Sequence, residues 1–243
     1  NGINENAYAI SENGEYVIEY TRRDISGTII ATVNCIDKQA PRIEGIENGA
    51  VYTQPTSITI SDDNLDSITL IRNGQTVEFT NGETIAEEGE YKITAIDKAE
   101  NVTTYIFTYV KLANPNYEII EDKYIVNIEP NTTVRKFLDN LKISLDISIE
   151  NQNVQLNDKD VITTGTVMTI DNNITYILVV TGDVSGDGNV NIADLVKLNM
   201  YSIQKATLEN EYLLAGDVNH DGDVDIGDLV RLNLYSIGKI TSL

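Results

Sequence analysis

Short runs of alternating apolar and polar residues dominate the first half of the chain. Between residues 40 and 111, apolar side chains recur at every second position, the period of a half-buried β-strand. Turn residues separate these runs, and Asn73-Gly74 is a dipeptide that two-residue hairpins favour. The pattern predicts strands at 57–60, 67–71, 76–79, 91–96 and 103–110. Short strands at this spacing favour a β-sandwich over residues 40–111.

A sequence repeat extends this pattern to the N-terminus. The segment Glu-Asn-Gly-Glu-Tyr-Val-Ile at 12–18 echoes Glu-Glu-Gly-Glu-Tyr-Lys-Ile at 87–93. Residues 1–39 therefore correspond to the C-terminal half of the unit at 40–111. We expect residues upstream of Asn1 to complete this first sandwich, or its open edge to pair with a second chain.

The β-rich segments resemble the bacterial immunoglobulin-like repeats of Gram-positive surface proteins. The resemblance rests on Glu-Gly-Glu-Tyr-x-Ile at 88–93, on the segment Asp-Lys-Ala-Glu-Asn at 97–101, and on the join at 35–41. It implies two sandwich spacers. The acidic cluster of Asp62, Asp63 and Asp66 favours a capped turn over a cation site. Cys35, at a strand end, favours a small buried hydrophobic residue over a reactive thiol.

A different pattern occupies residues 112–181. Apolar residues at 134, 137, 138 and 141 lie on one face of a helix that the segment 131–133 can cap. Leu145, Ile147 and Ile149 alternate as in a strand, and strands are predicted at 161–170 and 174–180 around a turn at 171–173. The sequence predicts a small α+β module.

The C-terminal segment 182–243 repeats itself after 34 residues. Gly182-Asp183-Val184 aligns with Gly216-Asp217-Val218, and the match continues to Tyr201-Ser202-Ile203 and Tyr235-Ser236-Ile237. Repetition of this kind indicates two copies of one supersecondary unit. Helical periodicity predicts helices near 192–203 and 226–237, with a short third helix at 208–215.

Composition narrows the class of partner. The chain of 243 residues has 17 Lys and Arg against 38 Asp and Glu, a net charge of −21. Such a chain repels phosphate backbones and anionic membranes and attracts cations, so we expect no nucleic-acid partner. The chain has no apolar run long enough for a transmembrane helix, so we expect no membrane insertion. A lone cysteine and a lone histidine, His220, nearly exclude zinc chemistry.

Each C-terminal repeat begins with an EF-hand-like calcium loop. Oxygen ligands at alternate positions around a glycine turn converge on one ion, and Ca²⁺ takes six to eight such oxygens. The first loop offers Asp183, Ser185, Asp187, the carbonyl of Asn189, Asn191 and Asp194. The second offers Asp217, Asn219, Asp221, the carbonyl of Asp223, Asp225 and Asp228. The sequence predicts two Ca²⁺ ions, and it predicts a short strand pairing between Val190 and Val224.

Residues 182–243 resemble a type I-like dockerin, the module by which secreted clostridial enzymes and surface proteins attach to cohesin modules. The paired Asp-x-(Ser/Asn)-x-Asp-Gly segments carry this resemblance. It implies that a cohesin contacts Ile192, Ala193, Met200 and Tyr201 in the first repeat, and Ile226, Gly227, Leu234 and Tyr235 in the second. Many dockerins have Ser-Thr at the first pair, so the Ile-Ala and Ile-Gly pairs imply a more hydrophobic interface. The alternative is that Ile192 and Ile226 belong to the core.

The predicted fold class is therefore multidomain: mainly β, with immunoglobulin-like sandwich modules at 1–39 and 40–111, a small α+β module at 112–181 and an all-α calcium-binding dockerin at 182–243. No catalytic residues are suggested. We expect a secreted, extracellular or cell-surface tail of a Gram-positive anaerobe that docks on a cohesin, with dual-mode binding through its repeated helices. The alternatives are an adhesin whose sandwiches bind a host glycan or protein, and the tail of an upstream hydrolase or peptidase.

Overall fold

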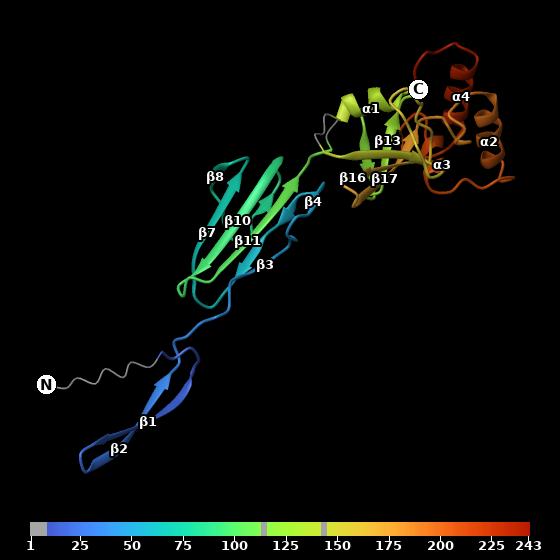
Figure 1. Ribbon diagram of the computed structural model, residues 1–243. Coiled ribbons are helices and arrows are strands. Elements are labelled where there is room, and N and C mark those ends of the chain that lie inside the picture. The colour runs from blue at the N-terminus through green and yellow to red at the C-terminus, as the bar shows by residue number, and fades with distance from the viewer. Residues whose placement is uncertain (1–8, 113–115, 142–144) are drawn as a thin grey trace. The chain divides into compact units, whose positions relative to one another are not determined.

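The computed structural model describes residues 9–112, 116–141 and 145–243. The contacts divide the chain into two compact units, Asn1–Tyr109 and Val110–Leu243. Residues 1–8, 113–115 and 142–144, which belong to the predicted modules 1–39 and 112–181, lie outside the described residues. The chain is mainly β, and three of the four helices in the described part lie near its C-terminus (Figure 1).

The first unit begins with a two-stranded hairpin. β1 (Gly14–Arg22) pairs antiparallel with β2 (Ile25–Val33). Apolar side chains are exposed along both strands; they are Val17, Ile18, Tyr20, Ile25, Ile29 and Ile30. Cys35 follows the hairpin and is exposed, so the expectation of a buried cysteine is wrong, because no core in the described part of the chain covers this strand end. Pairing of two chains through the hairpin stays a prediction.

Residues 42–109 form a β-sandwich. Its larger sheet has five strands in the order β4 (Val51–Tyr52), β11 (Val102–Tyr109), β10 (Gly89–Asp97), β7 (Leu65–Arg72) and β8 (Gln75–Val77). Two small sheets pair β3 (Arg42–Glu44) with β6 (Thr59–Ser61), and β5 (Thr56–Ser57) with β9 (Thr84–Ile85). The turn between β7 and β8 is Asn73-Gly74, as predicted, with φ of 49° and 79°.

One hydrophobic core joins these sheets. Ile43 and Ile60 from the β3–β6 pair, and Ile85 from β9, pack in one cluster with Ile93 of β10 and Phe107 of β11. Along β10 from Tyr91 onward, fully buried side chains alternate with exposed or half-buried ones, which is the period of a strand with one face in a core. The strands predicted at 67–71, 76–79, 91–96 and 103–110 correspond to β7, β8, β10 and β11. The strand predicted at 57–60 is instead divided into β5 and β6, which pair in different sheets.

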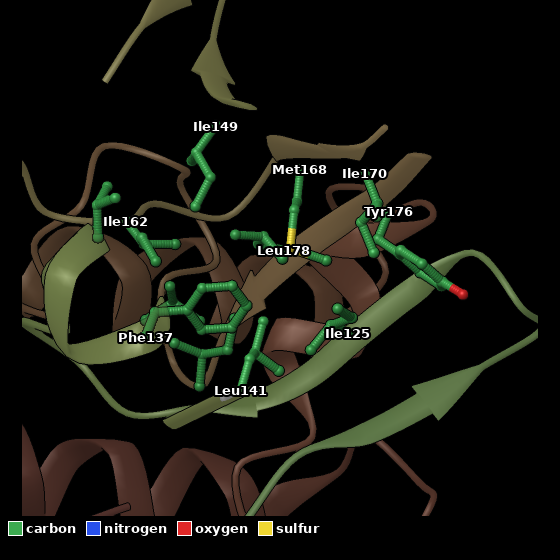
Figure 2. Close-up of a cluster of buried hydrophobic side chains, with 12 residues drawn as sticks. Ile125, Phe137, Leu141, Ile149, Ile162, Met168, Ile170, Tyr176 and Leu178 are labelled. Carbon is green, nitrogen blue, oxygen red and sulfur yellow. The ribbon is translucent and has the colours of Figure 1, made fainter. Parts of the chain in front are cut away.

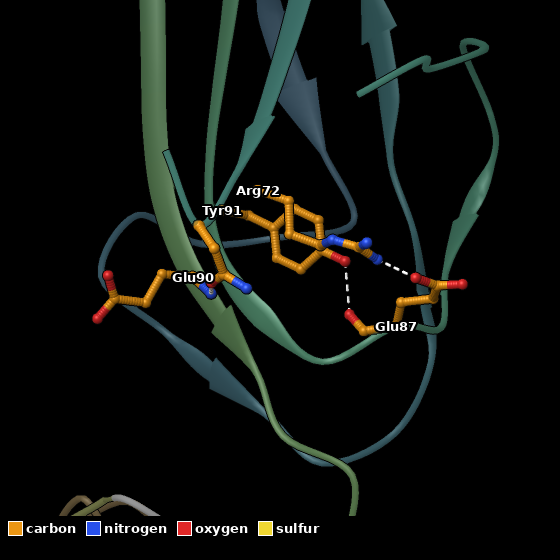
Figure 3. A network of polar contacts seen from close by, with 5 residues as sticks. Arg72, Glu87, Glu90 and Tyr91 are labelled. Carbon is orange, nitrogen blue, oxygen red and sulfur yellow. Dashed lines mark hydrogen bonds and ion pairs between the residues drawn. The ribbon is translucent and has the colours of Figure 1, made fainter. Parts of the chain in front are cut away.

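A tyrosine at the start of β10 fixes the corner that leads into this strand. The Tyr91 hydroxyl donates to the backbone carbonyl of Glu87, whose carboxylate pairs with Arg72 (Figure 3). The hairpin has the same bond, because the Tyr16 hydroxyl donates to the carbonyl of Glu12 at 2.6 Å. A tyrosine that bonds back to the preceding corner is a feature of immunoglobulin-like sandwiches. The repeat found in the sequence is thus also a repeat of local structure.

The second unit is built on a six-stranded sheet. Its order is β12 (Glu118–Ile120), β13 (Tyr124–Ile128), β17 (Ile174–Val180), β16 (Thr166–Ile170), β14 (Ile147–Asn151) and β15 (Val154–Gln155). Helix α1 (Val134–Leu141) carries Phe137 and Leu141 into a core with Ile125, Met168 and Leu178 of the sheet (Figure 2). The predicted helix and its apolar face are confirmed.

The strand predicted at 161–170 is shorter than expected. Strand β16 begins at Thr166, and residues 162–165 form a loop that ends at Gly165 with φ of 93°. Val161 instead bridges Thr133 at the start of α1. This loop, residues 162–165, lies against the C-terminal repeat.

The central strands β13 and β17 are buried on both faces. Their far side, opposite α1, forms a second cluster in which Tyr124, Val126 and Val179 pack against Ala215. Ala215 belongs to α3 (Glu211–Gly216), and this helix contacts both strands. The sheet and the C-terminal helices therefore share a core, and both predicted modules, 112–181 and 182–243, lie within one compact unit.

The two longer C-terminal helices are α2 (Ile192–Ser202) and α4 (Ile226–Ser236), close to the predicted bounds. They pack against each other, and Leu198 and Leu232 are buried in the core of this part. Helix α3 begins at Glu211 and not at 208, because Asn210 before it has a φ of 53°, outside the helical region.

Candidate functional site

The two predicted calcium loops end on the first turns of α2 and α4. Asn191 and Asp225 are the N-caps of these helices, and Asp194 and Asp228 occupy the third helical position in a capping box. Both of these aspartates are fully buried. The last predicted ligand of each loop is therefore held in place by the helix that follows it.

Each buried aspartate also closes its own loop. Asp194 accepts from the amides of Ser185 at 2.8 Å and Asn191 at 2.9 Å. Asp228 accepts from the amides of Asn219 at 3.1 Å and Asp225 at 2.8 Å, and also from the amide of Val218 at 2.8 Å. The last predicted ligand of each loop thus accepts from equivalent amides in the two repeats.

The first loop is the more enclosed of the two. Asp183 is fully buried and accepts from the amide of Gly186 at 2.9 Å. Burial raises the pKa of the Asp183 carboxyl, and the Asp194 carboxylate adds to this effect, while backbone hydrogen bonds, the largest from Thr164, lower it. A cation between the two carboxylates would relieve the cost of burying them.

The second loop is more open. Asp217 is half-buried, and its carboxylate accepts from the amides of Asp221 at 3.2 Å and Gly222 at 3.0 Å. Asp221 and Asp223 are exposed. His220 at the fourth position of this loop is also exposed.

The donor set suits Ca²⁺. Carboxylate and carbonyl oxygens are the ligands that this hard cation prefers. The hydroxyl oxygen of Ser185, at the third loop position, is buried and has no hydrogen-bond partner among the described residues. A buried polar oxygen without a partner costs free energy, and a bound cation would satisfy it.

The valines at the eighth loop positions, Val190 and Val224, do not form the predicted strand pairing. The described residues contain no strand pairing between Val190 and Val224. Both valines instead pack on the core of the C-terminal helices. Gly182 has a φ of 85°, and a Cβ on it would meet Val190 at 2.9 Å, so the close packing of this valine depends on glycine.

The predicted partner face is largely on the surface. Ile192 is 62% exposed and Ile226 is 72% exposed, so the alternative that they are core residues is wrong. Met200 and Leu234 are also exposed. Ala193 is exposed, Gly227 and Tyr235 are half-buried, and Tyr201 is half-buried against the core.

The structure adds four apolar residues to this face that sequence reasoning missed. Val196 and Val230 lie one turn after the exposed isoleucines and are 51% and 55% exposed, and Ile203 and Ile237 follow the two helices, also exposed. The sequence feature that could have identified them is the repeat, because each pair is identical at equivalent positions of the two copies. A groove between α2 and α4 is lined by Leu195, Val196, Ile226, Leu229, Val230 and Leu234.

The other candidate residues lie in the first unit. Asp62 accepts from the amide of Asn64 at 2.7 Å, which is the predicted capped turn. Carboxylate oxygens of Asp37, Asp62 and Asp97 lie within 4.8 Å of one another. Hydrogen bonds from the side chains of Asn64 to Asp37 and of Asn101 to Asp97 hold this cluster together.

In the described part of the chain, no helix is both long and apolar enough to span a bilayer.

Comparison with known families finds one match. Residues 181–235 match the family described as the dockerin type I domain. No curated protein matches the chain. Among solved structures, the titin Ig tandem domains A164-A165 have 13% sequence identity and a TM-score of 0.24, covering 58% of this chain and 97% of that one. The titin domains z1z2, solved in complex with telethonin, have 12% identity and a TM-score of 0.23, covering 60% and 98%.

Similarities as low as those to titin assign neither fold nor function. The family match does assign the C-terminal repeat: residues 181–235 form a dockerin type I domain, as the resemblance at 182–243 predicts. Dockerins are non-catalytic modules with a cohesin-binding, calcium-dependent assembly role, and the proteins that carry them are typically extracellular.

Proposed function

We propose that this chain is a non-catalytic assembly tail whose dockerin holds two Ca²⁺ ions and binds a cohesin through the face formed by α2 and α4. The observation that carries the proposal is the pair of matching loop and helix units, each with a buried aspartate at the end of its loop and an exposed isoleucine beside it. The cohesin attaches the secreted protein to a multienzyme complex or a cell-surface scaffold.

Bound calcium stabilises this face because it fixes the first turn of each helix. Asp194 and Asp228 are at once the predicted twelfth ligands and members of the capping boxes of α2 and α4. An ion that fixes these carboxylates also fixes the first helical turns, where Ile192 and Ile226 lie. Because the folded state holds the ligands together and the unfolded chain does not, binding and folding are linked.

The repeated face supports binding in two orientations. Ile192, Val196 and Met200 in the first repeat have their counterparts in Ile226, Val230 and Leu234, and all six are exposed. If the two units are related by a near two-fold axis, a half turn of the dockerin presents almost the same apolar side chains to the cohesin. We infer a dual-mode interface of hydrophobic character.

The test uses the full chain and a panel of purified cohesin modules, with binding measured in calcium. Ile192→Asp and Ile226→Asp are expected to weaken binding by only a few-fold each, because the other orientation remains. The double variant is expected to lose binding by at least about 100-fold, since a charge at the centre of an apolar interface is costly. Val154→Asp, which places the same charge on an exposed valine of β15, is the matched control and leaves binding unchanged.

Two results would contradict the proposal. Wild-type affinity in the double variant, with calcium binding intact, would exclude the α2–α4 face. Complete loss of binding in one single variant alone would leave the face in place and exclude the dual mode.

A further inference from the structure

The two calcium loops differ most at their fourth positions. The first loop has Gly186 where the second has His220, although both backbones have positive φ, 77° and 60°. A Cβ on Gly186 would lie 2.8 Å from the Tyr212 ring and 3.2 Å from the carbonyl oxygen of Thr164. His220 has room for a full side chain and is exposed. Glycine is therefore needed at 186 because other residues cover the first loop.

The sixth positions show the same difference. Gly188 and Gly222 have similar φ values, 83° and 92°. A Cβ on Gly188 would meet the Cγ2 methyl of Thr163 at 2.8 Å, whereas a Cβ on Gly222 would have nothing within 4 Å. Thr163 is β-branched, and its hydroxyl accepts a hydrogen bond from the side-chain amide of Asn151 at 3.0 Å. Moving its methyl group away from Gly188 would therefore cost free energy.

Apart from Tyr212 of α3, the residues that cover the first loop, Thr163 and Thr164, come from the loop at 162–165 of the α+β module. The amide of Thr164 donates to the Oδ2 atom of Asp183 at 2.9 Å. The Thr164 hydroxyl is itself fixed, because it accepts from the amide of Val180 at 3.1 Å and lies 3.2 Å from the carbonyl of the same residue. Asp217, the counterpart of Asp183, accepts from the amides of its own loop, those of Asp221 and Gly222.

We propose that the loop at 162–165 is part of the first calcium site, where it positions Asp183 and covers one side of the calcium loop, so that the two sites of this dockerin differ in affinity and release rate. This inference rests on the proposed binding of two Ca²⁺ ions. Affinity in such loops depends on ligand charge and on the rigidity of the site. The first site, with a preorganised and buried aspartate, binds more tightly and releases its ion more slowly than the open second site.

The first experiment exchanges the residues at the fourth loop position. Calcium binding to the full chain is measured by calorimetric titration, and calcium release is followed after rapid mixing with a chelator. We expect two release phases in the wild type, assigned with Asp187→Ala for the first loop and Asp221→Ala for the second. Gly186→His is expected to weaken the tighter site by roughly 10- to 100-fold, as changes to outer-shell contacts do. His220→Gly, the matched control, leaves both sites within a few-fold of wild type.

If Gly186→His does not fold, a second pair of variants tests the same proposal. Gly188→Ala and Gly222→Ala share the backbone strain of alanine at positive φ, so the excess loss of affinity in Gly188→Ala measures contact with Thr163. Adding Thr163→Ser removes the Cγ2 methyl and keeps the hydroxyl, and we expect it to abolish that excess.

The outcomes separate the two proposals. Equal effects in the two loops, with no rescue by Thr163→Ser, would overturn the role of the 162–165 loop while two calcium sites remain. A folded wild-type chain that binds fewer than two calcium ions would overturn the proposed function itself.

Discussion

In both units, buried aspartates hold a loop or a turn together by accepting hydrogen bonds. Asp183, Asp194 and Asp228 close the calcium loops, and Asp97 closes the turn after β10 in the sandwich. All four are nearly or fully buried, and each accepts at least two hydrogen bonds. The structure uses backbone amides to stabilise the carboxylates of the sandwich and of the loops alike.

The Asp97 carboxyl makes the stability of the sandwich depend on pH. Burial opposes its ionisation, but hydrogen bonds from the side chain and amide of Asn101 and from the amide of Ala99 lower its pKa below the ordinary value. The unfolded chain therefore takes up this proton first as pH falls. The contribution of Asp97 to stability is present above its ordinary pKa and is lost as pH falls through its folded-state value.

This dependence is measured by urea unfolding of the full chain, followed by circular dichroism between pH 7 and pH 3. We expect Asp97→Asn to destabilise the sandwich at pH 7 and to flatten the loss of stability on acidification. Asp66→Asn, an exposed carboxylate of the same sandwich, is the control and follows the wild type. An unchanged acid dependence in Asp97→Asn would contradict this account.

Residue patterns predicted the ligand sets but not their surroundings. The spacing of Asp, Ser and Asn in each loop was enough to identify the loops, because their ligands are local in sequence. The bond from Thr164 to Asp183 joins residues 19 apart in the chain, and Thr164 donates through its backbone. Sequence pattern does not encode a backbone donor of this kind, so the asymmetry between the loops emerges only in the fold.

Strand β17 is the element that joins the α+β sheet to the dockerin. Its residues alternate between two cores: Leu178 faces α1, and Val179 packs with Ala215 of α3. The run at 174–180 predicted a strand, and a run with few polar breaks is typical of a strand buried on both faces. The sequence did not show which helix covers the second face, because α3 is short and lies more than 30 residues further along the chain.

Val179 therefore tests whether the two parts fold as one. We expect Val179→Ala to lower the free energy of unfolding of the second unit by roughly 1–3 kcal/mol, the cost of removing buried methyl groups from a packed site. Val167→Ala, on an exposed position of the neighbouring strand β16, is the matched control, expected to change stability by less than about 0.5 kcal/mol. Chemical denaturation checks both, and a neutral effect of Val179→Ala would mean that α3 does not cover the sheet.

At the scale of the whole molecule, the hairpin and the sandwich are β-rich. The predicted calcium ligands and partner-binding residues all lie in the C-terminal part of the chain. The net charge of −21 favours the binding of cations. The predicted order of modules agrees with the order of elements along the chain, whereas the domain boundaries stay predictions. The function proposed for this chain is assembly with a cohesin when its dockerin holds calcium.

The most direct test is the binding of the full chain to immobilised, purified cohesin modules, measured by biolayer interferometry in calcium and again after addition of EGTA. We predict binding to at least one cohesin in calcium and its loss in EGTA, with return of binding when calcium is restored. Absence of binding to every cohesin by a folded, calcium-loaded chain, or binding that EGTA leaves unchanged, would contradict the claim.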